Sequence, residues 1–314
     1  LASGGFNRHP KRRGEWLPGV SPDWCPAAPG HTGSAQDLAI AIGASYGATE
    51  LASDPAEDGK VLSHAFWAPV SIRKRADGSV AAFPHFVMDR GKPGMITVNQ
   101  RGERFVNEST SYHLFGLAMQ AADRHAPSIP AWLVCDAEAL ARYGLGMIRP
   151  GAKEGASIAP FLADGYLTRG QTVAELAAKM GADPAVLTAT IERFNAAAER
   201  GVDAEFQRGS TDYQRANGDA TRSAKNPCLG ALRTGPYYAI RLYPGDIGAA
   251  TGLRTDAAAR VLDQRGEPIA GLYACGNDMH SIMGGTYPAP GITIGPGLTF
   301  AYLAAQDAVA RSAT

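Results

Sequence analysis

The sequence predicts an α/β fold at both ends of the chain and an α+β block inserted between them. Near the C-terminus, the apolar strand "GLYACG" (271–276) precedes a glycine-rich loop and the helix "GLTFAYLAAQDAVAR" (297–311). A strand, a glycine turn and a helix in this order are typical of α/β units, in which the first N–H groups of the helix face a ligand. At the other end, "LASGGF" (1–6) has the pattern of a buried strand that turns on Gly4–Gly5. This order favours two halves of one nucleotide-binding domain that enclose a second domain.

One helix and several short strands are expected in the first third of the chain. Ser34, with Asp37 three residues later, has the pattern of a capping box ahead of a helix of small residues that ends near Gly47. Residues 61–107 alternate and are rich in Val, Ile and Phe, which indicates strands at "AAFPHFVM" and "MITVNQRGERFVN". Within the second of these, "NQRGE" predicts a turn between two short strands.

Helices resume in the middle of the chain, and strands return toward its end. The predicted helices cover 111–124, 136–143, a segment capped by Thr172 with Glu175, and a segment with Asp183 as its cap, Pro184 as its first residue and Gly201 as its stop. A polar, irregular stretch follows over 202–227. A strand is expected over 237–243, and a hairpin with a second strand over 259–276.

The size of the chain is consistent with this division. It has 314 residues, 45% of them hydrophobic, which is enough to build two domains rather than one. We expect residues 1–60 and 243–314 to form the two parts of the nucleotide-binding domain. Residues 61–242 are expected to form the inserted, substrate-binding domain.

Composition excludes several function classes. The net charge is zero and the Lys/Arg runs are short, so no nucleic-acid partner is implied. The longest uncharged apolar windows, near 131–135 and 268–275, are too short to cross a bilayer. The four cysteines are scattered, which fits reduced thiols in a cytoplasmic protein, and the seven histidines show no H-x-x-x-H pair that would indicate a metal site.

Four motifs follow one another along the chain. They are "ASGGF", "VNQRGERFVNES", "PGDIGAATGLRTDAAARVLDQRGEPIAGLYACGN" and "MGGTYPAPGITIGPGLTFAYLAA". In this order and spacing they resemble the FAD-dependent superfamily of fumarate reductases, succinate dehydrogenase flavoproteins and 3-ketosteroid dehydrogenases. The resemblance implies a Rossmann-like flavin-binding part and FAD as the cofactor. The N-terminal G-x-G-x-x-G phosphate loop of that family is not found and the chain opens without Met, so we expect upstream sequence to be missing.

Two tyrosines distinguish between the branches of this superfamily. Fumarate reductases have arginines where this chain has Tyr112, in "NESTSYH", and Tyr287, in "GTYPAPG", and they carry histidine in the segment that corresponds to "PGDIGAATG". A dicarboxylate substrate needs cationic, forked donors, which tyrosine does not supply. By contrast, "YPAPG" is similar to the Tyr-Pro-Gly-Pro-Gly loop of 3-ketosteroid dehydrogenases.

The resemblance to 3-ketosteroid dehydrogenases implies a reaction and three catalytic residues. A carbon–carbon bond next to a ketone would be desaturated in a small, apolar, steroid-like substrate. Tyr112 would remove the α-proton, and the Tyr287 hydroxyl and the Gly291 backbone N–H would stabilise the enolate oxygen. The hydride would pass to flavin N5. The sequence does not identify the external electron acceptor.

The resemblance also implies a set of cofactor-binding residues. They come from the first turn, from the segment "HTGSAQD", from the end of the last strand and from the glycine loop with the helix N-terminus that follows it. The set comprises Ala2, Ser3, Gly4, Gly5, Thr32, Ser34, Gly276, Asn277, Ile292, Thr293, Ile294 and Gly295. Where the family has a "TGDG" turn, this chain has Ser34 and Ala35 after the threonine and glycine.

Other polar residues are assigned simpler roles. We expect Arg104 to pack against carboxylates such as Glu108. His31 and His280 are interpreted as hydrogen-bonding loop residues. For Asp246, a role in a turn and a place in the site both remain open.

Two rival hypotheses remain. The first is a flavin-dependent alkene reductase of the fumarate type, which would act on fumarate with a reduced dye and not on a Δ4-3-ketosteroid. The second is a truncated, non-catalytic flavoprotein fragment, for which a colourless protein as isolated would be expected.

Overall fold

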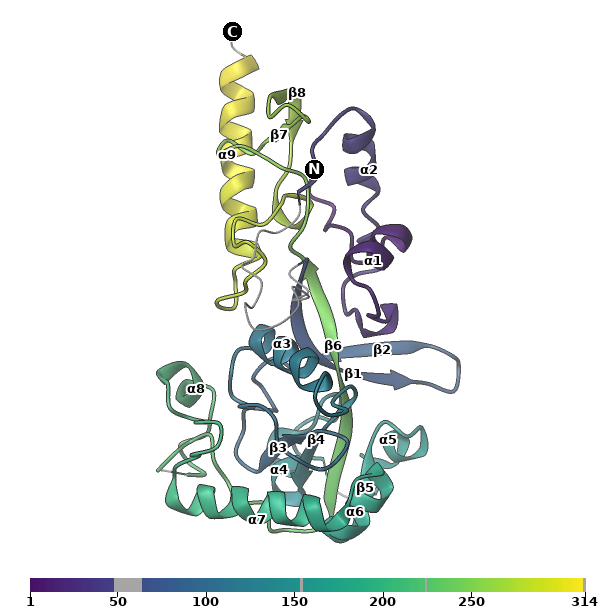
Figure 1. The fold of residues 1–314 in the computed structure, drawn as a ribbon, viewed down its shortest axis with the longest axis vertical. Coiled ribbons are helices and arrows are strands. Elements are labelled where there is room, and N and C mark those ends of the chain that lie inside the picture. The colour runs from purple at the N-terminus through teal and green to yellow at the C-terminus, as the bar shows by residue number, and fades with distance from the viewer. Residues whose placement is uncertain (48–63, 153–154, 224, 313–314) are drawn as a thin grey trace. The chain divides into compact units, whose positions relative to one another are not determined.

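The computed structural model describes residues 1–47, 64–152, 155–223 and 225–312, and these form two compact units (Figure 1). The first unit joins Leu1–Trp67 to Asp246–Thr314, and the second covers Ala68–Gly245. The expected domain boundary at residues 60–61 lies outside the described residues. The assignment of cofactor and substrate roles to the two units stays a prediction.

The second unit is built on a sheet of six strands. The strands are β1 (Ala65–Lys74), β2 (Val80–Pro84), β3 (Met95–Val98), β4 (Ala131–Asp136), β5 (Thr168–Gly170) and β6 (Tyr237–Ala249). Their order is β2-β1-β6-β4-β3, and β5 also pairs with β6. The pairs β1–β2, β3–β4, β4–β6 and β5–β6 are antiparallel. The predicted strand "AAFPHFVM" is shorter than expected, because β2 ends at Pro84. The first residues of β1 and the last residues of β6 belong to the first unit.

Helices cover both faces of this sheet. They are α3 (Tyr112–Asp123), α4 (Ala137–Tyr143), α5 (Ala159–Ala163), α6 (Val173–Met180), α7 (Pro184–Arg200) and the short α8 (Asp212–Ala216). Along β4, Leu133 and Cys135 join the core beneath α3 and α4, whereas Trp132 and Val134 join the core beneath α6 and α7. Because both faces are buried, "AWLVC" (131–135) is an unbroken apolar run.

The capping signals in the middle of the chain are confirmed. Asp183 accepts N–H bonds at the start of α7, Pro184 is the first helical residue, and Gly201 ends the helix with a φ of 80°. Thr172 accepts a bond from the Glu175 backbone N–H at the start of α6. These signals are local, so they act whatever the rest of the chain does.

The capping box expected in the first unit is wrong. Helix α2 (Ser34–Ala41) has Gly33 at its N-cap, with a φ of 71° and no side-chain cap, and it ends well before Gly47. The carboxylate of Asp37 forms an ion pair with Arg12 instead. The side chain of Asp37 therefore binds Arg12, which is remote in sequence, and does not cap the N-terminus of α2.

The remaining elements of the first unit are short, apart from the last helix. They are α1 (Pro10–Trp16), η1 (Pro22–Trp24), the antiparallel hairpin of β7 (Arg260–Leu262) and β8 (Pro268–Tyr273), η2 (Gly276–Asp278) and α9 (Ile294–Ser312). The hairpin is as predicted, but "LASGGF" is not a strand. Leu1 alone pairs with the end of β8, donating to the Tyr273 carbonyl at 2.6 Å and accepting from Cys275 at 3.0 Å. The Rossmann-like arrangement of this part stays a prediction.

Asp246 connects the start of the first unit to the end of β6. Its carboxylate is fully buried and accepts two bonds of 2.7 Å from Arg13 and one of 2.7 Å from the Asn7 side chain. The turn role is therefore wrong, because Asp246 lies inside β6, where its carboxylate forms an internal ion pair; a place in the site stays a prediction. All four cysteines are free thiols, and three of them are buried.

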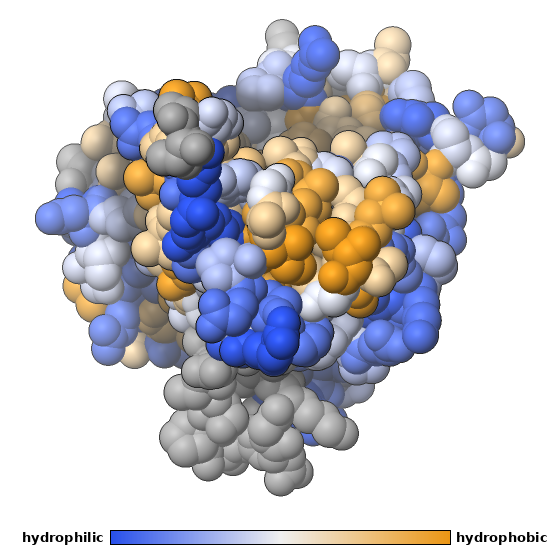
Figure 2. Space-filling view, turned by 90° about the horizontal axis from the view of Figure 1, so that it is seen from above, coloured by the Kyte–Doolittle hydropathy of each residue, from blue (hydrophilic) through white to orange (hydrophobic). Residues whose placement is uncertain are grey.

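Helix α9 exposes an apolar face. None of its described residues is buried, and Ile294, Leu298, Tyr302 and Val309 are each more than 60% exposed. Figure 2 shows that, on the face drawn there, apolar side chains (orange) gather between hydrophilic ones (blue). An exposed apolar stripe of this kind is typical of a surface that contacts another polypeptide.

No helix in the part of the chain that the structure describes is long and apolar enough to cross a membrane.

A buried ion network holds the second unit together. Glu108 is fully buried and accepts bonds from Arg104 at 2.7 and 2.8 Å, from Arg208 at 3.1 Å, and from the Thr97 backbone N–H at 3.1 Å. Arg104 also binds Asp203 at 2.9 Å. The predicted pairing of Arg104 with Glu108 is confirmed.

We predict that Glu108→Gln lowers the free energy of unfolding by about 3–5 kcal/mol, because it leaves two buried guanidinium groups short of a counter-charge. Urea unfolding followed by circular dichroism measures this. The matched control is Glu175→Gln, which removes an exposed ion pair with Lys179 and should cost less than about 1 kcal/mol. Equal effects of the two variants would contradict the prediction.

Candidate functional site

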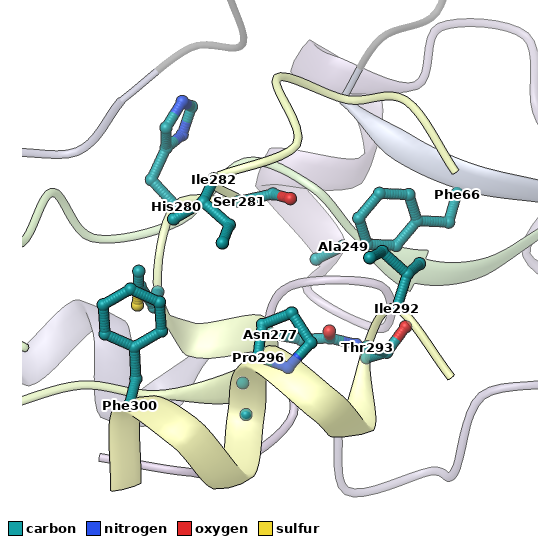
Figure 3. Close-up of a pocket in the computed structure, with 13 residues that line it drawn as sticks. Phe66, Ala249, Asn277, His280, Ser281, Ile282, Ile292, Thr293, Pro296 and Phe300 are labelled. Carbon is teal, nitrogen blue, oxygen red and sulfur yellow. The ribbon is translucent and has the colours of Figure 1, made fainter. Parts of the chain in front are cut away.

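A pocket in the first unit is formed where the two separated segments of that unit meet (Figure 3). It is lined by Phe66, Ala249, Gly276, Asn277, Met279, His280, Ser281, Ile282, Ile292, Thr293, Pro296, Gly297 and Phe300. Phe66 and Phe300 stand at opposite ends, and Asn277 and Thr293 lie between them beside the start of α9. The lining therefore combines apolar walls with a few polar atoms, as cofactor pockets usually do.

Glycine backbone forms one side of this pocket. A Cβ added to Gly297 would lie 3.5 Å from the Cα of Gly276, so η2 and the first turn of α9 pack backbone against backbone. A Cβ on Gly276 or Gly295 would meet no atom of the described residues within 4 Å, so a ligand can approach the main chain there. The N-terminus of α9, next to Thr293, adds the positive end of a helix dipole.

The predicted cofactor residues divide into three groups. Gly276, Asn277, Ile292 and Thr293 line the pocket, and Ile294 and Gly295 begin α9 beside it. The others lie elsewhere in the same unit and do not line this pocket: Ala2, Ser3, Gly4, Gly5, Thr32 and Ser34. Their role toward a cofactor stays a prediction.

Asp278 is a residue of the site that sequence reasoning missed. Its carboxylate is fully buried and accepts bonds from the Ser3 backbone N–H, from the Ser3 hydroxyl at 3.0 Å and from the Gly5 N–H at 3.0 Å. Ser3 and Gly5 are 275 and 273 residues away from Asp278 in the sequence, so no local sequence pattern predicts this contact. Ser3 and Gly5 therefore use these donors inside the protein, next to Asn277.

Tyr287 is buried in the loop that leads to α9. Its ring packs edge-on against Phe66, with centroids 5.0 Å apart, and its hydroxyl oxygen accepts a bond of 3.4 Å from the Thr293 hydroxyl. Both partners line the pocket. Gly291, with a φ of 93°, accepts from the Gly295 N–H at 2.8 Å and so shapes the entry to α9.

Tyr112 is the first residue of α3 in the second unit. It is only 4% exposed, and its ring packs edge-on against Phe86 with centroids 4.9 Å apart. Leu114 and Met88, two residues beyond each of these, are exposed apolar side chains. Tyr112 and Tyr287 belong to different units, so their meeting at one substrate stays a prediction.

The loop that carries Phe86 is fixed by a buried polar chain. His85 bonds to Asp89 at 2.6 Å through Nδ1 and to the Ser71 hydroxyl at 2.7 Å through Nε2, and Ser71 in turn bonds to Tyr166 at 2.6 Å. Arg90 donates to the carbonyl of Thr110 at 2.8 Å, two residues before Tyr112. Both sides of the Phe86–Tyr112 contact are thus held from within the unit.

The chain belongs to the FAD-binding domain family, whose pattern matches residues 1–294. FAD is accordingly the cofactor of the family to which this fold belongs.

Two curated relatives match the whole chain. One is a 3-oxosteroid 1-dehydrogenase of Mycolicibacterium smegmatis, which is 37% identical over 320 aligned residues; the alignment covers 100% of this chain and 52% of the dehydrogenase. The other is a 4-oxocyclohex-2-ene-1-carboxylate 5-dehydrogenase of Sinomonas cyclohexanicum, which is 37% identical over 316 aligned residues; the alignment covers 100% of this chain and 51% of the dehydrogenase. The chain therefore spans about half the length of the curated relatives it matches.

A solved structure has the same fold. It is the 3-ketosteroid Δ1-dehydrogenase of Sterolibacterium denitrificans in complex with 1,4-androstadiene-3,17-dione. The TM-score is 0.85 at 35% identity, over 98% of this chain and 52% of the other.

The Asp89–His85 pair generates a pH prediction. Burial alone would raise the pKa of Asp89, but His85 and the backbone N–H groups of Gly146 and Arg90 lower it to about 2. The pKa of an unfolded aspartate is about 3.9. Because the folded pKa is the lower one, this stabilisation is complete above about pH 4 and is lost as the pH falls toward 2.

We therefore predict that the free energy of unfolding falls more steeply between about pH 4 and pH 2 in the wild type than in Asp89→Asn. Urea unfolding at several pH values within the range where both proteins fold measures the two slopes. Parallel slopes would show that Asp89 is not protonated preferentially in the unfolded state.

Proposed function

We propose that the chain is the flavin- and substrate-binding part of an FAD-dependent dehydrogenase that desaturates a carbon–carbon bond beside a ring ketone, as 3-oxosteroid dehydrogenases do. The observation that carries the proposal is the buried Tyr287, packed against two residues of the pocket wall in a chain of the FAD-binding domain family. The names of the two curated relatives support this proposal, since each describes a dehydrogenase that acts on a compound with an oxo group.

The chemistry of the residues that line the pocket of the first unit suits a flavin. Phe66, Ile292 and Phe300 offer apolar contact for a flat ring system, while Asn277, Thr293 and the N-terminus of α9 offer polar contact for its edge. Open space at the Gly276 and Gly295 backbone leaves room for the ring to approach. When bound there, FAD would supply the two-electron oxidant of the reaction.

Tyr112 is proposed as the base that takes the α-proton. As the first residue of α3, it lies at the positive end of the helix dipole, which favours a negatively charged phenolate. The contact with Phe86 and the exposed apolar residues nearby suit a substrate with an apolar body. The second unit, Ala68–Gly245, is accordingly proposed as the substrate domain.

Tyr287 and Gly291 are proposed as the donors to the substrate ketone. The Thr293 hydroxyl donates to the Tyr287 oxygen, so the position of the Tyr287 hydroxyl is fixed beside the pocket wall. A Cβ at Gly291 would meet no described atom within 4 Å, so a ketone oxygen can approach its backbone N–H. Two such donors stabilise an enolate oxygen more than the neutral ketone, which lowers the barrier to proton removal.

A smaller cyclic ketone is a second candidate substrate. It is favoured by the Sinomonas relative, whose identity over the whole chain equals that of the oxosteroid dehydrogenase. A carboxylate on that substrate would need a cationic partner, whereas this chain has the tyrosines Tyr112 and Tyr287 where the dicarboxylate-binding fumarate reductases have arginines. This supports the uncharged ketosteroid as the first candidate.

We predict that Tyr287→Phe lowers turnover of a Δ4-3-ketosteroid by at least about 10²-fold in the FAD-loaded enzyme, on the scale of one lost oxyanion donor. Reduction of an artificial dye measures the rate, and absorbance of the bound flavin checks that loading is unchanged. The matched control is Tyr302→Phe, an exposed tyrosine on α9.

The same assay separates the alternatives. Turnover of 4-oxocyclohex-2-ene-1-carboxylate without turnover of the steroid would favour the smaller substrate, and oxidation of a reduced dye by fumarate would favour a fumarate-type reductase. An unchanged rate in Tyr287→Phe would remove Tyr287 from the mechanism.

A further inference from the structure

Arg90 is a fully buried residue whose guanidinium group donates to three backbone carbonyl groups. Its Nε donates to the His85 carbonyl at 3.0 Å, one terminal nitrogen donates to the Thr110 carbonyl at 2.8 Å, and the other donates to the Glu108 carbonyl. The planar group also lies over the ring of Phe115, 4.8 Å from its centroid. One side chain therefore ties together two segments of the second unit.

The three carbonyl groups depend on this side chain. No other hydrogen bond to them is found among the residues that the structure describes. Within the same described residues, no carboxylate lies at ion-pair distance from Arg90, whereas Arg104 and Arg208 bind the carboxylate of Glu108. A charge buried without a counter-charge costs stability, and the hydrogen bonds to the carbonyls offset that cost. The contacts of Arg90 are therefore with the path of the backbone rather than with another ion.

On one side, Arg90 fixes the start of α3. The Thr110 carbonyl lies two residues before Tyr112, and Phe115 lies three residues after it. The guanidinium group therefore contacts the chain both before and after Tyr112. This holds the backbone that carries the tyrosine side chain.

On the other side, Arg90 fixes the loop that packs against Tyr112. The His85 carbonyl accepts from Arg90 Nε, and the next residue, Phe86, contacts the Tyr112 ring with centroids 4.9 Å apart. Phe86 is 37% exposed, so packing on its other side is incomplete. Loss of the guanidinium group would therefore loosen both partners of this ring contact at once.

We propose that Arg90 is a positioning residue for Tyr112, the base that removes the α-proton. The inference rests on the proposed function, which gives Tyr112 this role. Proton removal depends steeply on geometry, since a displacement of about 1 Å can lower a rate by about 10²-fold. Substrate affinity depends less on Tyr112, because Tyr287 and Gly291 are the proposed donors to the ketone. Loss of Arg90 should therefore lower kcat more than it raises KM.

The experiment compares two substitutions of Arg90 in the FAD-loaded enzyme. Arg90→Met keeps the length of the side chain and removes every donor, whereas Arg90→Lys keeps a single cationic group. With a Δ4-3-ketosteroid and an artificial dye, we expect kcat to fall by about 10- to 100-fold in Arg90→Met, KM to change by less than about 3-fold, and Arg90→Lys to lie between Arg90→Met and the wild type.

The matched control is Lys92→Met. It also removes a cation that donates to backbone carbonyls of the second unit, those of Asn217 and Gly218 at 2.7 and 2.9 Å. These carbonyls are not part of the loop at Phe86 or of the turn before α3. This variant should therefore keep the kcat of the wild type.

Isotope effects distinguish positioning from general damage to the fold. If proton removal alone becomes slower, a substrate deuterated at the carbon beside the ketone should show a larger kinetic isotope effect on kcat in Arg90→Met than in the wild type. Partial unfolding would lower the fraction of active enzyme and leave the isotope effect unchanged. Circular dichroism and flavin absorbance check folding and loading. If Arg90→Met does not fold, Arg90→Lys carries the same comparison.

A second readout does not depend on turnover. Tyr112 is replaced by 3-fluorotyrosine, and the ring is observed by fluorine NMR. We expect one sharp resonance in the wild type and in Lys92→Met. A shifted or exchange-broadened resonance is expected in the Arg90 variants, because the ring then occupies more than one position.

The outcomes for this inference and for the proposed function are distinct. A kcat and an isotope effect that match the wild type in a folded Arg90 variant, or an unchanged fluorine resonance, would refute this inference alone. An FAD-loaded wild type that turns over no ring ketone would refute the proposed function, and with it the role of Arg90.

Discussion

The buried carboxylate of Asp278 joins segments of the first unit that are remote in sequence. Asp278 binds three donors of the Ser3–Gly5 turn, and its backbone carbonyl accepts from the Gln36 side chain at 3.2 Å. Three segments that are remote in sequence, namely the first turn, α2 and η2, therefore meet at one residue. The apolar core of this unit is small, so polar contacts of this kind do much of the joining. Asn277 precedes Asp278 and lines the pocket, so the position of the pocket follows from the same contact.

The second unit is stabilised mainly by apolar packing rather than by polar contacts between remote segments. Its sheet is buried on both faces by helices, and two large apolar clusters form on either side of β4. Charged groups in this core are joined in networks, such as Glu108 with its two arginines. Such a unit tolerates little local change, which suits a platform that must keep Tyr112 and Phe86 in place.

The difference between the units explains what the sequence could predict. Caps such as Asp183 and Thr172 act on the next turn of the chain and were predicted correctly, as was the hairpin of β7 and β8. The predicted capping box at Ser34 was wrong because the Asp37 carboxylate binds Arg12, which is 25 residues away in the sequence. Asp278 was missed because its partners are at the opposite end of the sequence. Sequence patterns therefore described the residues of the glycine loop, whereas the contacts that shape the pocket required the fold.

The glycine loop before α9 now has a physical explanation. Gly276 and Gly297 bring η2 and α9 into backbone contact, and Gly291 sets the direction in which the chain enters the helix. Tyr287 lies between these glycines, buried against Phe66, and is held by Thr293. A side chain in that position is fixed by the same residues that line the pocket. A residue placed in this way cannot move without altering the pocket, so in the proposed reaction the ketone donor and the flavin would be aligned by one set of contacts.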